Sequence, residues 1–240
     1  MSLLVPSRAA ARELIDQPGH PYPDVERSLR DIQWVNRNLS GWRVLRGCLS
    51  RMLAPVPLHR PLRILDLGTG AADLPRSVVA WGRGQGRRIE VLGVDVNPHV
   101  IECARRECAG TAGVQLVRAD LFRLPFPPRS FDLVVCSLFL HHFDPPDAVR
   151  VLRIMAAQAR LGVLLNDLQR HRLAHWGIWV LSRLMRRGRM FRHDAPLSVL
   201  RAYRTRELRS LLLEAGLAHL RVERVFPFRM AVYGATREPA

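Results

Sequence analysis

Short apolar runs alternate with helix-length amphipathic stretches through the middle of the chain. The runs have the composition of buried strands and occupy residues 62–67, 89–95, 114–120, 131–136 and 161–167. Between them, apolar residues recur at helical spacing over 72–81, 98–108 and 146–160. Strands that alternate with helices of this length indicate a parallel sheet covered on both faces, with right-handed crossovers.

The chain before this alternation is predicted to be irregular and then helical. Prolines and a glycine make residues 1–22 an irregular lead-in. Apolar residues then follow at helical spacing from Asp24, the expected N-cap, to Leu39. A second helix is expected over 42–53, because Pro55 ends it. Residues 1–58 are therefore interpreted as an N-terminal helical cap.

The last third of the chain predicts an amphipathic insertion, a helix and a hairpin. Residues 171–192 mix apolar side chains with arginines, and their apolar stretch is too short to span a bilayer. A helix is expected over 205–215, with Thr205 as its N-cap and Gly216 as its C-cap. Two further strands, over 220–226 and 228–233, would pair as an antiparallel hairpin.

The predicted fold class is α/β, with the strands gathered into one sheet. We expect a doubly wound, mostly parallel sheet of seven strands with an antiparallel C-terminal hairpin and a helical cap. Residues 59–240 would form this Rossmann-like domain, with a helical insertion at about 168–204 acting as a lid over the substrate.

Composition adds a strong excess of positive charge to this picture. The 240 residues carry a net charge of +16, and the chain contains no lysine, so arginine supplies all of it. Such a surface either attracts polyanions, anionic lipid or anionic small molecules, or is a solvated arginine surface. Four cysteines without C-x-x-C spacing predict neither a zinc site nor a redox pair. No signal peptide is recognised, so a cytoplasmic location with reduced thiols is expected.

The turn after the first strand, Asp66-Leu-Gly68-Thr-Gly70, is the first indication of chemistry. Its glycines permit positive φ and leave bare backbone against which a ligand can lie. Ligands of open α/β sheets bind beyond the carboxyl ends of the strands, where this turn stands. Asp73 occupies the third glycine position of the G-x-G-x-x-G fingerprint, where a carboxylate would repel a pyrophosphate. A cationic amino group would suit Asp66 or Asp73 better.

Carboxylates also end the next two strands. Asp95 stands where it can accept both hydroxyls of a ribose, and Asp120 where it can accept from an adenine amino group. The expected ligand has a ribose, an adenine and a zwitterionic tail, which fits S-adenosylmethionine. Each of these two aspartates could instead be a helix N-cap, and Asp66 could be only a residue that caps the turn at the strand end.

Four segments in order carry a family resemblance: the turn at 66–70, Gly-Val-Asp95, Arg-Ala-Asp120-Leu, and the stretch 131–143 that ends in Phe-Leu-His-His-Phe. With them the chain resembles the class I S-adenosylmethionine-dependent methyltransferases, most closely the small-molecule and quinone-biosynthesis type, over about residues 62–167. The resemblance implies S-adenosylmethionine as cofactor, with Gly68 and Gly70 under its methionine part, Asp95 on the ribose and Asp120 on the adenine.

Two more positions follow from the same resemblance: Val96 and Leu121 would flank the base. Cys136 is expected separately to be a buried strand residue near the cofactor and not a nucleophile, because no basic residue stands beside it. Ala72 stands where many members have a third glycine, and alanine fits that place if its φ is negative.

Methyl transfer from a sulfonium needs alignment and exclusion of water, and a hydroxyl or acidic carbon acceptor must also lose a proton. Candidates for the base follow the fourth and fifth strands: His142, His141 and Asp167. The histidines could instead only shape the pocket or hydrogen-bond within it. No metal site is predicted, because adjacent histidines are expected to point apart and the pair His171/His175 lacks a third ligand.

The expected acceptor is a hydrophobic small molecule: a phenol, a quinone precursor or a polyketide-like compound, methylated at oxygen rather than carbon. The insertion supplies apolar side chains for a lid, or for plain core packing: Trp176, Trp179, Met185, Met190 and Phe191. Residues 170–209 hold 11 arginines against Asp194 and Glu207, so an anionic membrane surface or an acidic acceptor are further candidate partners. Oligomeric state is left open.

Other functions remain as alternatives. The charge admits an RNA methyltransferase, but the segment after the fourth strand, 136–140, lacks the Asn/Asp-Pro-Pro-aromatic motif of exocyclic-amine methylation, so nucleic acid is disfavoured as a partner. A nicotinamide oxidoreductase is disfavoured by Asp73. A nucleotide-binding scaffold without catalysis is the third alternative.

Overall fold

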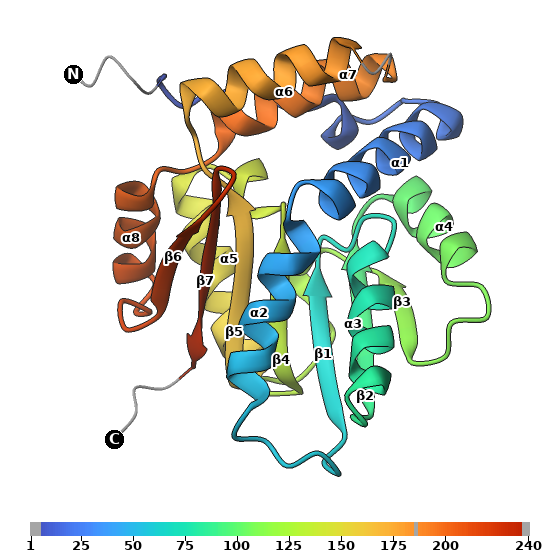
Figure 1. The fold of residues 1–240 in the computed structure, drawn as a ribbon, viewed down its shortest axis with the longest axis vertical. Helices are drawn as coiled ribbons and strands as arrows, with labels where there is room; N and C mark the ends of the chain where they lie inside the picture. The colour runs from blue at the N-terminus through green and yellow to red at the C-terminus, as the bar shows by residue number, and fades with distance from the viewer. Residues whose placement is uncertain (1–5, 185–186, 237–240) are drawn as a thin grey trace.

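The computed structural model describes residues 6–184 and 187–236. Their strands are β1 (Leu62–Leu67), β2 (Ile89–Asp95), β3 (Val114–Arg118), β4 (Phe131–Ser137), β5 (Ala159–Leu168), β6 (Arg221–Val225) and β7 (Arg229–Ala235). Within the described residues they form a seven-stranded sheet in the order β3-β2-β1-β4-β5-β7-β6 (Figure 1). β1 to β5 run parallel, and β7 pairs antiparallel with both β5 and β6. The predicted fold class is confirmed.

Helices cover both faces of this sheet. They are α1 (Tyr22–Asn38), α2 (Gly41–Leu53), α3 (Asp73–Gly84), α4 (Pro98–Glu107), α5 (Pro145–Gln158), α6 (Arg172–Leu184), α7 (Arg189–Arg201) and α8 (Thr205–Glu214). Neighbouring strand residues point to opposite faces, so Ile64 packs with Leu49 of α2, while Leu65 packs with Leu152 of α5 and Leu212 of α8. The sheet therefore separates two hydrophobic cores.

The remaining helices lie across the carboxyl ends of the parallel strands. Figure 1 shows α6 and α7 side by side above the sheet, with α1 next to them, and α7 contacts both α1 and the short turn Leu14–Asp16. The predicted amphipathic insertion is thus a pair of helices. Met185, one of its expected lid residues, lies outside the described residues. No helix in 6–184 or 187–236 is both long and apolar enough to cross a membrane.

Several predicted element ends are wrong by a few residues. Pro21, not Asp24, is the N-cap of α1. Asp24 lies inside the first turn of the helix, where a proline is also tolerated. Arg204, not Thr205, is the N-cap of α8: its backbone N–H donates to the Glu207 carboxylate at 2.8 Å. The C-cap of α8 is Ala215, and Gly216 follows it with φ +78°.

The third strand also ends earlier than predicted. β3 stops at Arg118, because the carboxylate of Asp120 accepts from the backbone N–H of Phe122 at 2.9 Å and turns the chain into the 3-10 helix Leu121–Arg123. The alternative role of Asp120 as a cap is therefore realised, at a 3-10 turn.

Candidate active site

A cavity of about 760 Å³ lies between the carboxyl ends of the parallel strands and the helical cap. Its walls come from the glycine turn, the segments after β2, β3 and β4, the start of β7, residues 10–16, and helices α1, α6 and α7. Ten predicted site residues line it: Asp66, Gly68, Gly70, Asp73, Asp95, Val96, Asp120, Leu121, His141 and His142. The structure thus brings together residues from four separate strand ends.

Two predicted site residues do not line the cavity. Cys136 is fully buried in the core on the α5 side, where burial raises the pKa of its thiol well above the usual value. Its burial in β4 agrees with the expectation, and its place near the cofactor stays a prediction. Asp167 is also buried, and it acts on the site through His141.

The glycine turn is held open by backbone geometry. Gly68 has φ +68°, and a Cβ there would lie 2.3 Å from Cγ of Phe139, so no other residue fits. The backbone N–H groups of Gly68 and Thr69 both donate to the Val94 carbonyl, at 2.9 and 3.0 Å. The turn is therefore fixed to the end of β2, and it leaves bare backbone on the cavity wall.

Ala72 does not meet the condition expected of it. Its φ is +55°, in the left-handed region, and not negative. An L-residue with a Cβ carries a strain of roughly 1–2 kcal/mol in that conformation. Alanine in place of the third glycine therefore adds backbone strain to this turn.

Three carboxylates lie around the turn, and none of them forms an ion pair within the part of the chain that the structure describes. Burial raises the pKa of Asp66 to about 7, although its carboxylate accepts from Thr69 Oγ1 at 2.7 Å. Burial likewise raises the pKa of Asp95 to about 6, against backbone N–H donors from Asn97 and Gly70 at 3.0 and 3.4 Å. The pKa of Asp73 is raised by the same cause. A cationic ligand in the cavity would relieve this desolvation.

The positions expected to contact an adenine lie further along the sheet. Val96 is 61% exposed, Leu121 is buried, and Asp120 is exposed with its carboxylate turned to Phe122 N–H. All three line the cavity. They are grouped after β2 and β3, next to Asp95, as one elongated ligand would require.

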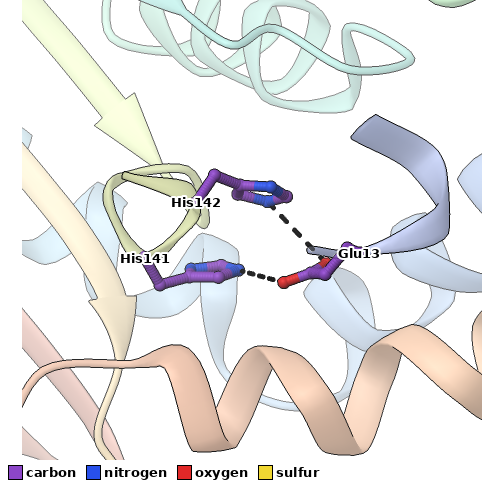
Figure 2. Close-up of side chains that lie close together, drawn as sticks. All are labelled: Glu13, His141 and His142. Carbon is purple, nitrogen blue, oxygen red and sulfur yellow. Dashed lines mark ion pairs between the residues drawn. The ribbon is translucent and has the colours of Figure 1, made fainter. Parts of the chain in front are cut away.

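The two histidines after β4 converge on one glutamate. Figure 2 shows His141 and His142 facing Glu13, with Nε2 of each histidine 3.5 and 3.9 Å from a separate carboxylate oxygen. The Nδ1 of His141 is 2.7 Å from Asp167, and that of His142 is 2.6 Å from Asp16. Three carboxylates therefore surround two imidazoles.

This arrangement shifts the titration of the cluster. Burial lowers the pKa of His141, but Asp167 and Glu13 outweigh it and raise the pKa to about 10. Burial also opposes the positive charge of His142, yet Glu13 and Asp16 raise its pKa above the usual value. Burial would raise the pKa of Glu13, and the two histidines instead lower it to about 2. The cluster thus favours imidazolium–carboxylate pairs.

The expectation that the adjacent histidines point apart is wrong. Their ring centroids are 4.5 Å apart and the planes are tilted by 33°, and both rings face Glu13 (Figure 2). One ligand atom each from Glu13, His141 and His142 lies within 4.8 Å of the others, so these residues could hold a metal ion. The stated reason for excluding a metal therefore fails.

Two buried arginines fasten the histidine loop to the N-terminal segment. Arg201 donates to the carbonyls of His141 and His142 at 3.2 and 2.6 Å and to that of Ala11 at 2.5 Å. Arg8 donates to the His141 carbonyl at 3.0 Å and to the Arg201 carbonyl at 2.7 Å. The segment predicted as an irregular lead-in is therefore built into the site.

The sequence reasoning missed Glu13, Asp16 and Arg229. The first two lie in the irregular segment, where no periodic pattern distinguishes them. Arg229 did have a signal: it shares the strand face of Ala231 and Tyr233, which are buried, so a buried arginine was foreseeable from alternation. Its guanidinium lines the cavity at the start of β7.

Comparisons with known proteins agree on one family. Residues 64–162 match a family described as a methyltransferase domain. A demethylmenaquinone methyltransferase of Deinococcus radiodurans is 31% identical over 115 residues, 45% of this chain and 44% of that protein. A malonyl-[acyl-carrier protein] O-methyltransferase of Halorhodospira halophila is 36% identical over 110 residues, 45% of this chain and 36% of that protein. The matches therefore span less than half of these relatives.

A solved structure extends the likeness in fold. Human N-acetylserotonin methyltransferase, determined in complex with S-adenosylmethionine, superposes with a TM-score of 0.60 over 90% of this chain and 56% of that one, at 16% identity. The likeness reaches beyond the matched domain into the C-terminal strands and the helical cap.

Proposed function

We propose that the chain is a class I S-adenosylmethionine-dependent methyltransferase that methylates a hydrophobic small molecule. Its fold and the match of residues 64–162 to a methyltransferase domain support this proposal. The acceptor is a phenol, a quinone precursor or a polyketide-like compound, and oxygen is the favoured atom. The observation that carries the proposal is the cavity over the glycine turn, with buried carboxylates at one end and a histidine pair in its wall.

The cavity wall fits S-adenosylmethionine. The backbone at Gly70 leaves room for the methionine part, because a Cβ there would have only Leu29 Cδ2 within 4 Å, at 3.9 Å, whereas the Phe139 ring packs against Gly68. The desolvated carboxylates of Asp66 and Asp73 suit the ammonium and sulfonium charges of the cofactor. Asp95 would hold the ribose hydroxyls. The residues after β2 and β3 would hold the adenine: Val96, Asp120 and Leu121.

The cofactor supplies an already activated methyl group, so the protein must align the acceptor, exclude water and manage one proton. Of the three base candidates, geometry favours His142. It lines the cavity, its side chain is 13% exposed, and Asp16 fixes its ring through Nδ1, whereas its Nε2 is 3.9 Å from Glu13, beyond hydrogen-bond distance. His141 is only 3% exposed, with Nδ1 at 2.7 Å from Asp167 and Nε2 at 3.5 Å from Glu13, so it and Asp167 act as positioning residues.

This placement supports methylation at oxygen. A histidine at the wall can take the proton of a phenolic hydroxyl directly, whereas an acidic carbon also needs its enolate to be stabilised. The relatives include C-methyltransferases and an O-methyltransferase by name, so the methylated atom must be identified in the reaction product. NMR of a methylated product would distinguish an O-methyl from a C-methyl group.

Two measurements test the proposed function. Titration calorimetry with S-adenosylhomocysteine and with NADH should give binding of the first alone, and binding of NADH alone would overturn it. Mass spectrometry of small-molecule extracts incubated with the protein and S-adenosylmethionine should reveal a compound that gains one methyl group. Extract incubated with His142→Ala protein is the matched control.

We also propose that the outer face of α6 docks on an anionic membrane surface, from which an apolar acceptor could enter. Leu173, Trp176 and Leu184 are 63%, 66% and 76% exposed on this helix, and Trp179 is 43% exposed. Exposed arginines of α6 and α7 flank them: Arg172, Arg183, Arg189 and Arg192. An apolar face bordered by arginines is the pattern of helices that lie in the headgroup region.

A further inference from the structure

A buried arginine at the β7 side of the cavity has a guanidinium group that the protein does not satisfy. Arg229 is 1% exposed, and its Nε donates to the Leu39 carbonyl at 2.9 Å. Within residues 6–184 and 187–236, neither Nη1 nor Nη2 has a hydrogen-bond partner, and the two carboxylates whose charges act on the group, Asp167 and Asp73, form no ion pair with it. Leaving a buried charge without contacts is costly unless a ligand completes them.

The other buried arginines show how this chain treats a structural guanidinium. Arg87 donates through Nη2 to the Leu53 and Val56 carbonyls, both at 2.8 Å. Arg170 donates through Nη1 to the Ala202 carbonyl and through Nη2 to Glu207. Arg201 uses both of its Nη atoms on backbone carbonyls. Arg229 is the exception among these four, and it is the one at the start of β7 on the cavity wall.

A second unpaired donor lines the same cavity. Nε2 of Gln33, on α1, is enclosed and has no hydrogen-bond partner among the described residues. A guanidinium with two free Nη atoms matches the two oxygens of a carboxylate, and such bidentate pairs are among the strongest hydrogen bonds in proteins. The unmet donors therefore call for an anion with more than one acceptor oxygen.

The order of strands places Arg229 away from the cofactor's nucleoside. Asp120, Asp95 and Gly68 follow β3, β2 and β1, so the cofactor would extend along these three strands. Arg229 begins β7, three strands beyond β1, which is about 14 Å at the usual spacing between strands. The long side chain of Arg229 shortens this separation, but its Cα atom lies over the half of the sheet that the cofactor would leave free for the acceptor.

We propose that Arg229 anchors a carboxylate-binding subsite of the cavity, and that the methyl acceptor is an aromatic or polyketide-like acid. The identity of the acid as a methyl acceptor rests on the proposed function, whereas the subsite itself does not. One other carboxylate could reach the same guanidinium, that of the cofactor's methionine part, and the experiment below separates the two.

The first arm compares an acid with its neutral counterpart. Calorimetry on protein loaded with S-adenosylhomocysteine measures 3-hydroxy-2-naphthoate against 2-naphthol, for wild type, Arg229→Met, Arg229→Lys and the exposed-arginine control Arg224→Met. Wild type and the control should prefer the acid by about tenfold or more, the worth of a charge-assisted hydrogen-bonded pair. Arg229→Met should lose the preference, and Arg229→Lys should keep part of it.

The second arm tests the cofactor as the source of the carboxylate. It measures S-adenosylhomocysteine against 5′-methylthioadenosine, which lacks the amino-acid part. If Arg229→Met weakens only the former by tenfold or more, the subsite holds the cofactor's carboxylate and the acidic acceptor is excluded. If neither this affinity nor the acid preference changes, or wild type shows no preference, the proposal is overturned.

Two controls keep these outcomes distinct. Arg229→Met should melt at or above the wild-type temperature, because it removes a buried charge whose two Nη atoms have no hydrogen-bond partner, and a large fall would mark a structural arginine and overturn the proposal. If the protein binds no S-adenosylhomocysteine, the proposed function fails. The acid and its neutral counterpart are then compared on unloaded protein, where the same preference and its loss in Arg229→Met test the subsite alone.

Discussion

Asp95 is a single carboxylate whose role a binding measurement can isolate. In the protein alone it accepts from Asn97 and Gly70 N–H groups and is buried against the cavity. Asp95→Ala should weaken S-adenosylhomocysteine binding by roughly 1–3 kcal/mol, the value of hydrogen bonds to a charged group. Calorimetry checks this against Glu214→Ala, a substitution at an exposed residue on α8. Equal affinities in the two variants would exclude Asp95 as the ribose ligand.

The titration of His142 should determine the pH dependence of the reaction rate. As a base it must be neutral, and Glu13 and Asp16 raise its pKa above 6.5 against the opposing effect of burial. We expect kcat/KM to increase with pH through an apparent pKa above 6.5. Glu13→Gln removes the carboxylate that raises the pKa of His142 most and should lower that midpoint.

The matched measurement uses His142→Ala and Glu214→Gln. The former should reduce turnover about 100-fold while leaving S-adenosylhomocysteine affinity unchanged, the usual size of a general-base contribution. Glu214→Gln should leave the profile where it is, because residue 214 is exposed on α8. A midpoint that Glu13→Gln does not move would rule out His142 as the titrating base.

Ala72 offers a test of backbone strain at one residue. Because its φ is +55°, Ala72→Gly should raise the free energy of unfolding by up to about 1 kcal/mol, the relief of strain less the entropy of glycine. Thermal unfolding would then shift upward by about 2–4 °C per kcal/mol. Ala71→Gly, a neighbour outside the left-handed region, should shift it downward, and a fall for both variants would contradict the strain.

At the scale of elements, hydrophobic period was enough to place the sheet and its crossover helices. β1 and β2 match their predicted ranges of 62–67 and 89–95, since apolar runs that are buried on both faces differ clearly from the amphipathic helices between them. The hairpin of β6 and β7 was also foreseen at its proline turn. Burial stabilises these elements, and the positions of apolar residues in the sequence indicate which segments are buried.

The ends of the elements and the structure of the helical cap were harder to predict, because side-chain contacts determine them. Arg204 caps α8 through Glu207, a pairing that composition does not mark. The insertion was recognised as amphipathic but not as two helices, since the break around Gly188 is fixed by its backbone N–H donating to Asp31 of α1 at 3.1 Å. Contacts between residues 157 positions apart leave no local pattern.

The candidate site divides in the same way. Motifs at strand ends were predictable, because parallel strands bring their carboxyl ends to one edge whatever the loops do. Ten of those residues line the cavity. Glu13 and Asp16 were not predictable, because an irregular segment has no periodicity and long-range contacts with α7 and with the histidine loop set its position. Asp194 of α7 accepts from the Leu14 and Ile15 N–H groups and holds that segment in place.

The paired charges between this segment and the β4–α5 loop predict a pH window of stability. The pKa of His141, raised to about 10, adds stability that is complete below pH 6.5 and is lost as pH rises toward 10. The pKa of Glu13, lowered to about 2, adds stability that is complete above pH 4.5 and is lost as pH falls toward 2. Both contributions are present together between pH 4.5 and 6.5.

Comparing His141→Gln with wild type by calorimetry from pH 4 to pH 10 checks this window. The melting temperatures should differ most between pH 4.5 and 6.5, by about 5 °C, and converge as pH rises. Using the difference between variants removes the effect of Asp66 and Asp95, which titrate in both proteins. A gap that is the same at every pH would mean that His141 contributes only packing.

For the whole molecule, the net charge of +16 and the exposed face of α6 lead to a measurable association. The protein should sediment with vesicles of phosphatidylcholine and phosphatidylserine and remain in solution with phosphatidylcholine alone. Trp176→Asp should reduce the bound fraction several-fold, because it places a charge in the apolar face. Leu213→Asp changes an equally exposed residue, at 69%, on α8 and should leave the bound fraction unchanged. Equal loss in both would assign the binding to charge alone.

The clamp between Arg201 and the carbonyls of residues 10 and 11 also has a consequence for synthesis. Its partners are separated by 191 and 190 positions, so the segment carrying Glu13 leaves the ribosome long before α7 exists to receive it. Contacts of such long range form late, because the closure of large loops slows their encounter. Nascent chains halted before Arg201 should therefore have β1 to β5 available but no docking place for the residues that complete the histidine cluster.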